Sequence, residues 1–214
     1  MDRTKRRLAV AVGVAAVLWF LMFSPWTKGI LNFWVEMSLS AVILTALGVG
    51  FSSDLTSLAK IEKPLLQIAG GVFLAFLLWG IFWVGDKASS WMFGFARDQV
   101  DLVYSMKTGL PPWAIALLLL FVIGPAEEFF WRGYVQRTMC SVMGGKRPED
   151  AAFVVTTLVY ALVHIWSLNF MLVMAALVAG AVRGLIYRLC PKALPALIIS
   201  HALWDALVFV IIPI

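Results

Sequence analysis

The 214-residue chain is 62% hydrophobic and only 14% charged, whereas soluble domains are about half apolar and about a quarter charged. This composition excludes a water-soluble fold and requires contact with a lipid bilayer. The net charge of +5 comes from basic residues at the ends of apolar runs, not from a stripe with interleaved aromatic residues, so nucleic acid is not an expected partner.

Seven apolar runs are long enough to cross a bilayer, which takes about 20 residues each. We expect an all-α, polytopic transmembrane helix bundle of about seven spans, with six to eight as the range, in one domain over residues 1–214. The first run follows a basic stretch and has no convincing cleavage site before Trp26, so it is interpreted as an uncleaved anchor. The predicted spans cover residues 8–23, 31–51, 64–84, 111–123 and beyond, 151–166, 170–189 and 193–212.

Two connections between the spans differ in character. Residues 86–109 are polar enough to leave the hydrocarbon and have apolar side chains that favour an amphipathic stretch along the outer interface. Residues 144–150 contain Gly-Gly and Pro and predict a tight inner loop. Cys140 and Cys190 are too few for a disulfide scaffold and are interpreted as packing residues.

The orientation follows from the placement of Lys and Arg, which gather on the cytoplasmic side of membrane proteins. With the N-terminus inside, the outer segments hold only Lys28, Lys87, Arg97 and Lys107. The inner segments then hold Arg3, Lys5, Arg6, Arg7, Lys60, Lys63, Arg132, Arg137, Lys146, Arg147, Arg183, Arg188 and Lys192. We therefore expect a cytoplasmic N-terminus.

Ionisable side chains inside three of the predicted spans are the main functional signal. Such a residue costs about 3 kcal/mol at mid-bilayer and is usually kept for a partner or a function. Each of the three spans has a polar pair at spacing i, i+4, which places both members on one helix face. The pairs are Glu128 with Arg132, Tyr160 with His164, and His201 with Asp205.

The adjacent residues Glu127 and Glu128 cannot have the same role, because neighbours on a helix point about 100° apart. If Glu128 pairs with Arg132, the Glu127 carboxylate is free to face a cavity. Pro125 removes a backbone hydrogen bond just before the two glutamates, and in a membrane such a break is tolerated beside polar groups or water. This pattern predicts a hydrated pocket beside Glu127.

The residue types in these pairs favour hydrolysis without a covalent intermediate. A carboxylate near a histidine can hold and deprotonate water, and a second polar pair can donate to a developing oxyanion. No Ser, Cys or Thr stands out as a nucleophile. Ser200 is next to His201, but adjacent helical side chains diverge, which argues against a serine–histidine pair.

Three motifs in order make the chain similar to a known family. The run from Glu127-Glu128 to Arg132, the aromatic residue four positions before His164, and His201 with Asp205 resemble the CAAX protease and bacteriocin-processing (CPBP/ABI) family of intramembrane glutamic endopeptidases. The resemblance covers about residues 111–214, which we take as the catalytic core formed by spans four to seven. It implies that Glu127 and His164 activate water, that His201 and Asp205 form the oxyanion site, and that Glu128 and Arg132 hold the architecture.

The sequence departs from this family at two positions, where the family usually has Phe and often has Asn. Tyr160 replaces the Phe and is interpreted as a supporting residue. Asp205 replaces the Asn, and an ionised carboxylate has no proton to donate. Asp205 must therefore be protonated or must orient His201. Glu127 and His164 also reach the same depth only if helices four and five both project past the inner surface, so helix four is expected to continue to about Met139.

The resemblance implies an intramembrane endopeptidase that needs no metal and acts on a membrane-anchored protein or peptide. The bacterial form of the first motif favours a bacterial or archaeal cell membrane and argues against a prenylated eukaryotic substrate. One alternative is a zinc protease with Glu127, His164 and His201 as ligands, although no His-Glu-x-x-His element is present. Another is a non-catalytic membrane partner or transporter in which the polar pairs only hold the helices together. The oligomeric state is not indicated.

Overall fold

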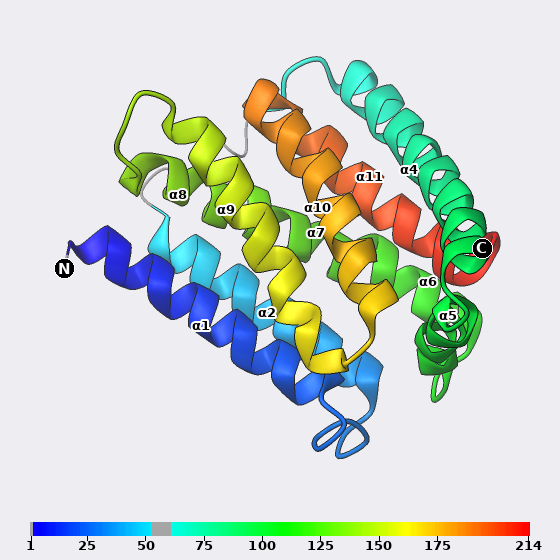
Figure 1. The fold of residues 1–214 in the computed structure, drawn as a ribbon. Helices are drawn as coiled ribbons and strands as arrows, with labels where there is room; N and C mark the ends of the chain where they lie inside the picture. The colour runs from blue at the N-terminus through cyan, green and yellow to red at the C-terminus, as the bar shows by residue number, and fades with distance from the viewer. Residues whose placement is uncertain (1, 53–60) are drawn as a thin grey trace.

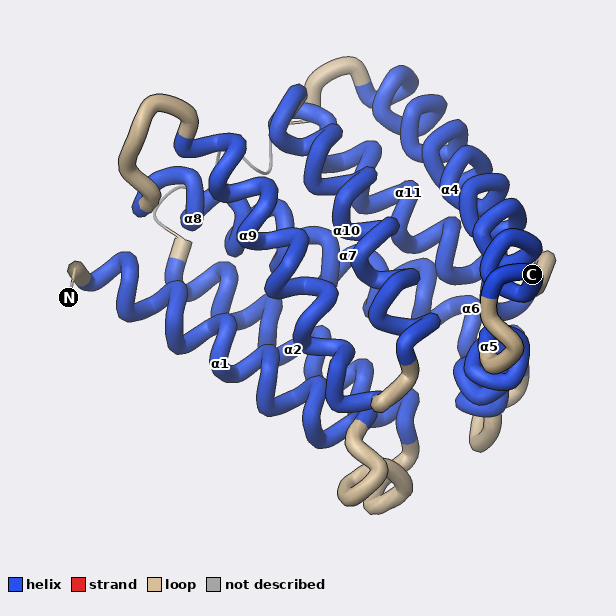
Figure 2. The backbone as a smooth tube through the Cα atoms, in the orientation of Figure 1, coloured by secondary structure: helices blue, strands red, loops and turns tan. Residues whose placement is uncertain are grey.

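The protein is a bundle of transmembrane helices. The computed structural model describes residues 2–52 and 61–214, so Lys60 of the orientation argument lies outside the described residues. The described residues form helices and connections with no strand, and seven of the helices are long and apolar enough to cross a membrane (Figure 1, Figure 2). The predicted all-α class and the number of spans are confirmed.

The first three spans are α1 (Arg3–Phe23), α2 (Phe33–Phe51) and α4 (Pro64–Met92). Asn32 caps α2 by accepting a hydrogen bond from the Trp34 amide at 3.0 Å, and Pro64 occupies the first turn of α4, where its missing N–H costs nothing. The third span was expected to end near residue 84, but α4 is 29 residues long and continues to Met92. The outer connection is therefore shorter than predicted and contains α5 (Ala96–Tyr104).

The fourth span is one helical segment over Pro112–Val142 with changes of pitch along its length. A π-helical stretch at Leu119–Ile123 precedes the α-helical turn α7 (Gly124–Glu128), and a second one follows at Phe129–Gln136. Pro125 lies in this turn, and its missing N–H favours a local change in the hydrogen-bonding pattern. The ends of the span are α6 (Pro112–Leu118) and α8 (Arg137–Val142), so the helix does continue past Met139.

The fifth span, α9 (Pro148–Leu162), tightens into a 3-10 turn at Val163–Ser167. Because α9 begins at Pro148 and α8 ends at Val142, Glu127 and His164 lie 15 and 16 residues from these inner ends. At about 1.5 Å per residue the two depths agree, which removes the conflict noted in the sequence. The last two spans are α10 (Phe170–Leu189) and α11 (Leu194–Ala206), followed by a π turn at Leu207–Ile211.

Glycine residues allow two helices to pack closely against α11. A Cβ atom on Gly124 would lie 2.6 Å from the Ala202 Cα, and one on Gly71 would lie 2.8 Å from the Ala196 carbonyl oxygen. Glycine at these positions therefore lets α7 and α4 approach the α11 backbone. In Figure 1, α1 and α2 lie at one edge of the bundle and α4 at the opposite edge. Outward apolar side chains such as Phe73 and Phe121 are 66% and 73% exposed, as expected for surfaces that face lipid.

Two of the arginines that were counted for the membrane orientation do not lie in the connections between the spans. Arg132 and Arg183 lie inside helices, and each is only 1% exposed. Without them the inner segments hold eleven of the basic residues named above and the outer segments hold four. The direction of the asymmetry is unchanged.

Candidate active site

Glu128 is the centre of a buried ion network. It lies in α7 and is fully buried. Its Oε1 atom is 3.3 Å from Arg132 Nε, and its Oε2 atom accepts from Arg132 Nη1 at 3.4 Å. The pair predicted from the i, i+4 spacing is therefore present in the structure.

Arg132 also connects the fourth span to two other helices. Its Nη2 atom donates to the Gly180 carbonyl oxygen of α10 at 3.1 Å, and its guanidinium lies 5.0 Å from the centre of the Tyr160 ring of α9. A Cβ atom on Gly180 would be 2.9 Å from the Tyr160 ring, so only glycine fits there without a shift. The architectural role of Arg132 stays a prediction, and these contacts are the observations that favour it.

His201 of α11 is held between two carboxylates. Its Nδ1 atom is 2.7 Å from Glu128 Oε2, and its Nε2 atom is 3.6 Å from Asp205 Oδ2. The sequence interpretation gave Glu128 only Arg132 as a partner, whereas the structure shares it between Arg132 and His201.

This geometry restricts where the protons of His201 can be. An ionised carboxylate only accepts hydrogen bonds, so the Nδ1 atom of His201 donates to Glu128, and the Nε2 atom of a neutral ring then has no proton. A donor toward an oxyanion at this side therefore requires a second proton, either on Nε2 or on Asp205.

Glu127 is placed differently from its neighbour. It is 5% exposed, and no hydrogen bond or ion pair joins its carboxylate to another described residue. The charged groups that interact with it electrostatically are Asp205, Arg183, Glu128 and Arg132. The Asp205 side chain is 13% exposed.

His164 is held by two groups that fix its tautomer. The Trp19 indole N–H donates to Nε2 at 3.0 Å, and Nδ1 lies 2.8 Å from the Tyr160 carbonyl oxygen. Because an indole can only donate and a carbonyl can only accept, the proton is on Nδ1. No described contact joins His164 to Glu127, and the joint activation of water by the two residues stays a prediction.

Tyr160 contacts two other aromatic side chains at the site. Its ring packs against Trp131 and His164, with ring centres 5.2 Å apart in both cases. Its hydroxyl interacts electrostatically with Glu127, Arg183, Arg132 and Asp205. The residue that replaces the usual Phe therefore adds a hydroxyl to the cluster.

Two residues at the site were not singled out from the sequence. Arg183 is a buried charge inside a predicted span, and the rule that singled out Glu127 would also have identified it. Instead it was counted among the basic residues of inner segments. Trp19 is an apolar-type residue in an apolar helix, and no sequence pattern distinguishes it from a core tryptophan.

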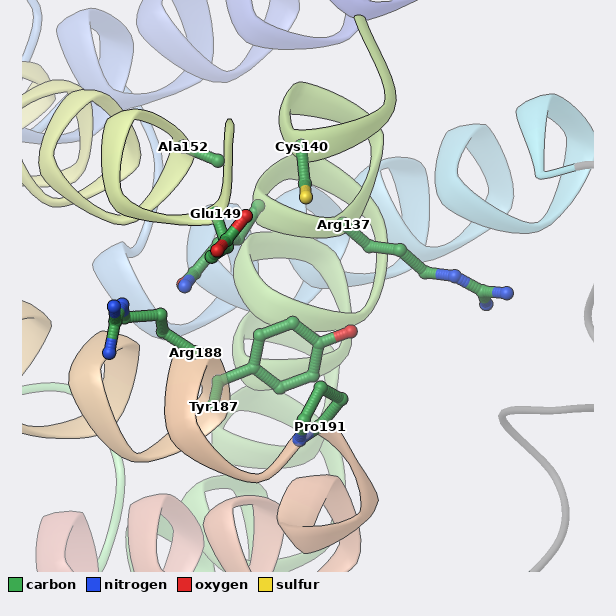
Figure 3. A pocket seen from close by; sticks show the side chains of 8 residues that line it. Arg137, Cys140, Glu149, Ala152, Tyr187, Arg188 and Pro191 are labelled. Carbon is green, nitrogen blue, oxygen red and sulfur yellow. The ribbon is translucent and has the colours of Figure 1, made fainter. Parts of the chain in front are cut away.

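Among the described residues, neither a group of potential metal ligands nor the cavity shown in Figure 3 coincides with the cluster. Within residues 2–52 and 61–214, no three His, Cys, Asp or Glu side chains are close enough together to hold a metal ion. A cavity of about 260 Å³ lies where the C-terminal ends of α8 and α10 meet the N-terminal end of α9 (Figure 3). The side chains that line it belong to Gln136, Arg137, Cys140, Glu149, Ala152, Tyr187, Arg188 and Pro191.

Part of the chain is similar to a known family. Residues 109–207 match the model of the Rce1-like family, described as type II CAAX prenyl endopeptidase Rce1-like. The chain carries an Rce1-like peptidase core. The matched segment contains every residue of the three motifs as well as Arg183, but not Trp19. The chain is therefore a membrane-integral peptidase whose residues 109–207 are similar to the CAAX type, a family that implies a membrane-associated peptide as substrate. Neither the curated proteins nor the solved structures contain a significant match to it.

Proposed function

We propose that this protein is an intramembrane endopeptidase in which Glu127 activates the water that attacks the peptide bond. The observation that carries the proposal is the contrast between two adjacent buried carboxylates. Glu128 is engaged by Arg132 and His201, whereas Glu127 has no hydrogen-bond partner among the described residues. A buried carboxylate with a free lone pair is suited to hold water and to take its proton.

The proposed reaction needs no covalent intermediate. Glu127 takes a proton from water while the water oxygen forms a bond to the carbonyl carbon, and the carbonyl electrons move to its oxygen. His201 and Asp205 then stabilise the oxyanion with a proton that they hold between them. When the tetrahedral intermediate collapses, the C–N bond breaks and Glu127 returns the proton to the leaving amine.

His164 has a conditional role in this proposal. Its unprotonated Nε2 atom is the one that would accept a hydrogen bond from the water, but in the structure this atom accepts from Trp19. Water can share Nε2 only if the indole moves or tolerates a second donor. His164 would therefore act after a small displacement of α1, or would act only by packing against Tyr160.

The substrate and the orientation belong to the same proposal. A membrane-anchored protein or peptide can reach a site that lies within the spans, and the excess of basic residues on one side favours a cytoplasmic N-terminus. The cavity at the inner ends of α8, α9 and α10 would then lie on the cytoplasmic side. We assign residues 1–214 to one domain whose catalytic core begins near residue 111, in a bacterial or archaeal cell membrane.

The test is cleavage of a membrane-tethered reporter by purified protein in liposomes. Glu127→Gln should lower kcat by about 100-fold or more, which is the usual range for losing a general base. Glu149→Gln removes an exposed carboxylate outside the site and is the matched control. Cleavage by Glu127→Gln at the rate of the control would reject the proposed role.

A further inference from the structure

Arg183 on α10 is a buried cation whose hydrogen-bonding capacity is unused. The residue is 1% exposed, and its Nε, Nη1 and Nη2 atoms all lack a hydrogen-bond partner. No ion pair joins it to a carboxylate among the described residues. A buried charge without a partner is costly and is seldom kept for stability alone. The guanidinium is therefore free to bind something that the protein itself does not provide.

The surroundings of Arg183 fix its position without using its N–H groups. Its guanidinium carbon lies 5.0 Å from the centre of the Trp204 ring, and Trp204 packs in turn against Phe82 of α4 with ring centres 4.6 Å apart. A guanidinium above an aromatic face is held by attraction to the ring while the edge of its plane stays available. Trp204 is thus a platform for the cation.

Two further donors lie on the same face of α11. Ser200 and Trp204 are spaced i, i+4, and both the Ser200 hydroxyl and the Trp204 indole N–H are buried without a partner. Arg183, Ser200 and Trp204 together form what we call the donor cluster. An unsatisfied donor set of this kind is suited to an anionic ligand.

The donor cluster borders the proposed reaction centre. Arg183 interacts electrostatically with Glu127 and with Asp205, although neither carboxylate is within ion-pair distance of it. Ser200 and Trp204 are the direct neighbours of His201 and Asp205 on α11, so an anion bound at the donor cluster would lie beside the proposed reaction centre. Neither carboxylate accepts a hydrogen bond from Arg183, so its N–H groups stay open.

We propose that the donor cluster binds a carboxylate of the peptide substrate, which is either its C-terminus or an acidic side chain near the cleaved bond. This inference rests on the proposed function, because it takes the ligand to be part of the peptide that Glu127 cleaves. The planar guanidinium matches the two oxygens of a carboxylate, and the indole and hydroxyl can donate to the remaining lone pairs.

The experiment uses full-length protein in liposomes and four versions of one membrane-tethered peptide. One pair differs only in a free or an amidated C-terminus, and the other pair differs only in an acidic side chain or its amide. Wild-type protein should cleave one carboxylate peptide with a kcat/KM 10-fold to 100-fold above that of its amide, mainly through KM, as expected for charged hydrogen bonds. The pair that shows this preference identifies the source of the carboxylate.

The variants then assign the preference to Arg183. Arg183→Gln should abolish the difference in kcat/KM between the carboxylate peptide and its amide, and Arg183→Lys should keep part of that difference. Arg188→Gln is the matched control, because Arg188 lies on the same helix but pairs with Asp150 near the cavity in Figure 3. Equal cleavage of all four peptides by wild-type protein would overturn the proposal, as would an equal loss for all four in Arg183→Gln.

A binding measurement separates this inference from the proposed function. The dissociation constants of the labelled peptides are measured for wild-type protein and for Glu127→Gln. Tighter binding of the carboxylate peptide, together with undiminished cleavage by Glu127→Gln, would support the donor cluster and reject glutamate catalysis. Cleavage that depends on Glu127 but shows no preference for the carboxylate peptide in binding or in rate would support glutamate catalysis and reject the donor cluster.

Discussion

The Nδ1 atom of His201 lies 2.7 Å from Oε2 of Glu128, a hydrogen bond between residues 73 positions apart in the chain. The same carboxylate is within 3.4 Å of Arg132, so one buried group serves a cation and an imidazole at once. This shared use separates the role of Glu128 from that of Glu127.

Glu128→Gln should therefore act mainly on stability. The change leaves Arg132 as a buried cation without its carboxylate, which usually costs about 3 kcal/mol. Thermal unfolding in detergent should show a clearly lower Tm, and the double variant Glu128→Gln/Arg132→Gln should recover part of the loss because the unpaired cation is gone. An unchanged Tm in the single variant would mean that the ion network does not stabilise the fold.

Asp205 offers a test that depends on pH. If Asp205 donates as a protonated acid, activity should fall as the pH rises, because deprotonation removes the donor. The groups that interact with it electrostatically are His201, Arg183, Glu127 and Glu128. Asp205→Asn should keep activity and flatten the alkaline limb, and Asp205→Ala should lose about 100-fold in kcat. An inactive but folded Asn variant would instead assign Asp205 to the orientation of His201.

Treatment with a strong chelator should leave cleavage intact. The motivation is that no three potential ligands come together among the described residues, and that the Nε2 atom of His164 already accepts from Trp19. Metal analysis of the purified protein provides the independent readout. Activity that disappears with chelation and returns with zinc would favour the metalloprotease alternative.

Trp19→Phe should change His164 while keeping an aromatic ring in the core. The indole N–H is the donor to Nε2, so its loss should leave the imidazole held only by the Tyr160 carbonyl oxygen and lower cleavage up to about tenfold, the value of one ordinary hydrogen bond. The chain has only two histidines, so nitrogen NMR can follow the tautomer directly. Trp26→Phe is the control, because Trp26 is 72% exposed. Faster cleavage by Trp19→Phe would show that the indole competes with water.

The sequence predicted those parts of the site that depend on spacing within one helix. The pairing of Glu128 with Arg132 follows from i, i+4 geometry alone, and the seven spans follow from length and hydropathy. The bond between Glu128 and His201 was not predictable, because it depends on how closely α7 approaches α11. That approach depends on Gly124, which looks like any helix-breaking glycine in the sequence. The presence of Arg183 at the site was predictable from its position within a span, but the residue was used only as evidence for the membrane orientation.

The contact of Trp19 with His164 means that a shortened form of this protein without the first helix would have an altered site. The indole comes from the first helix, whereas the imidazole lies in the segment that matches the peptidase family. A fragment limited to residues 109–207 would contain every motif residue but would present His164 with its Nε2 side uncovered. The first helix is thus a structural part of the imidazole's surroundings, and exchanging it for an unrelated anchor would change the site as surely as a substitution within it.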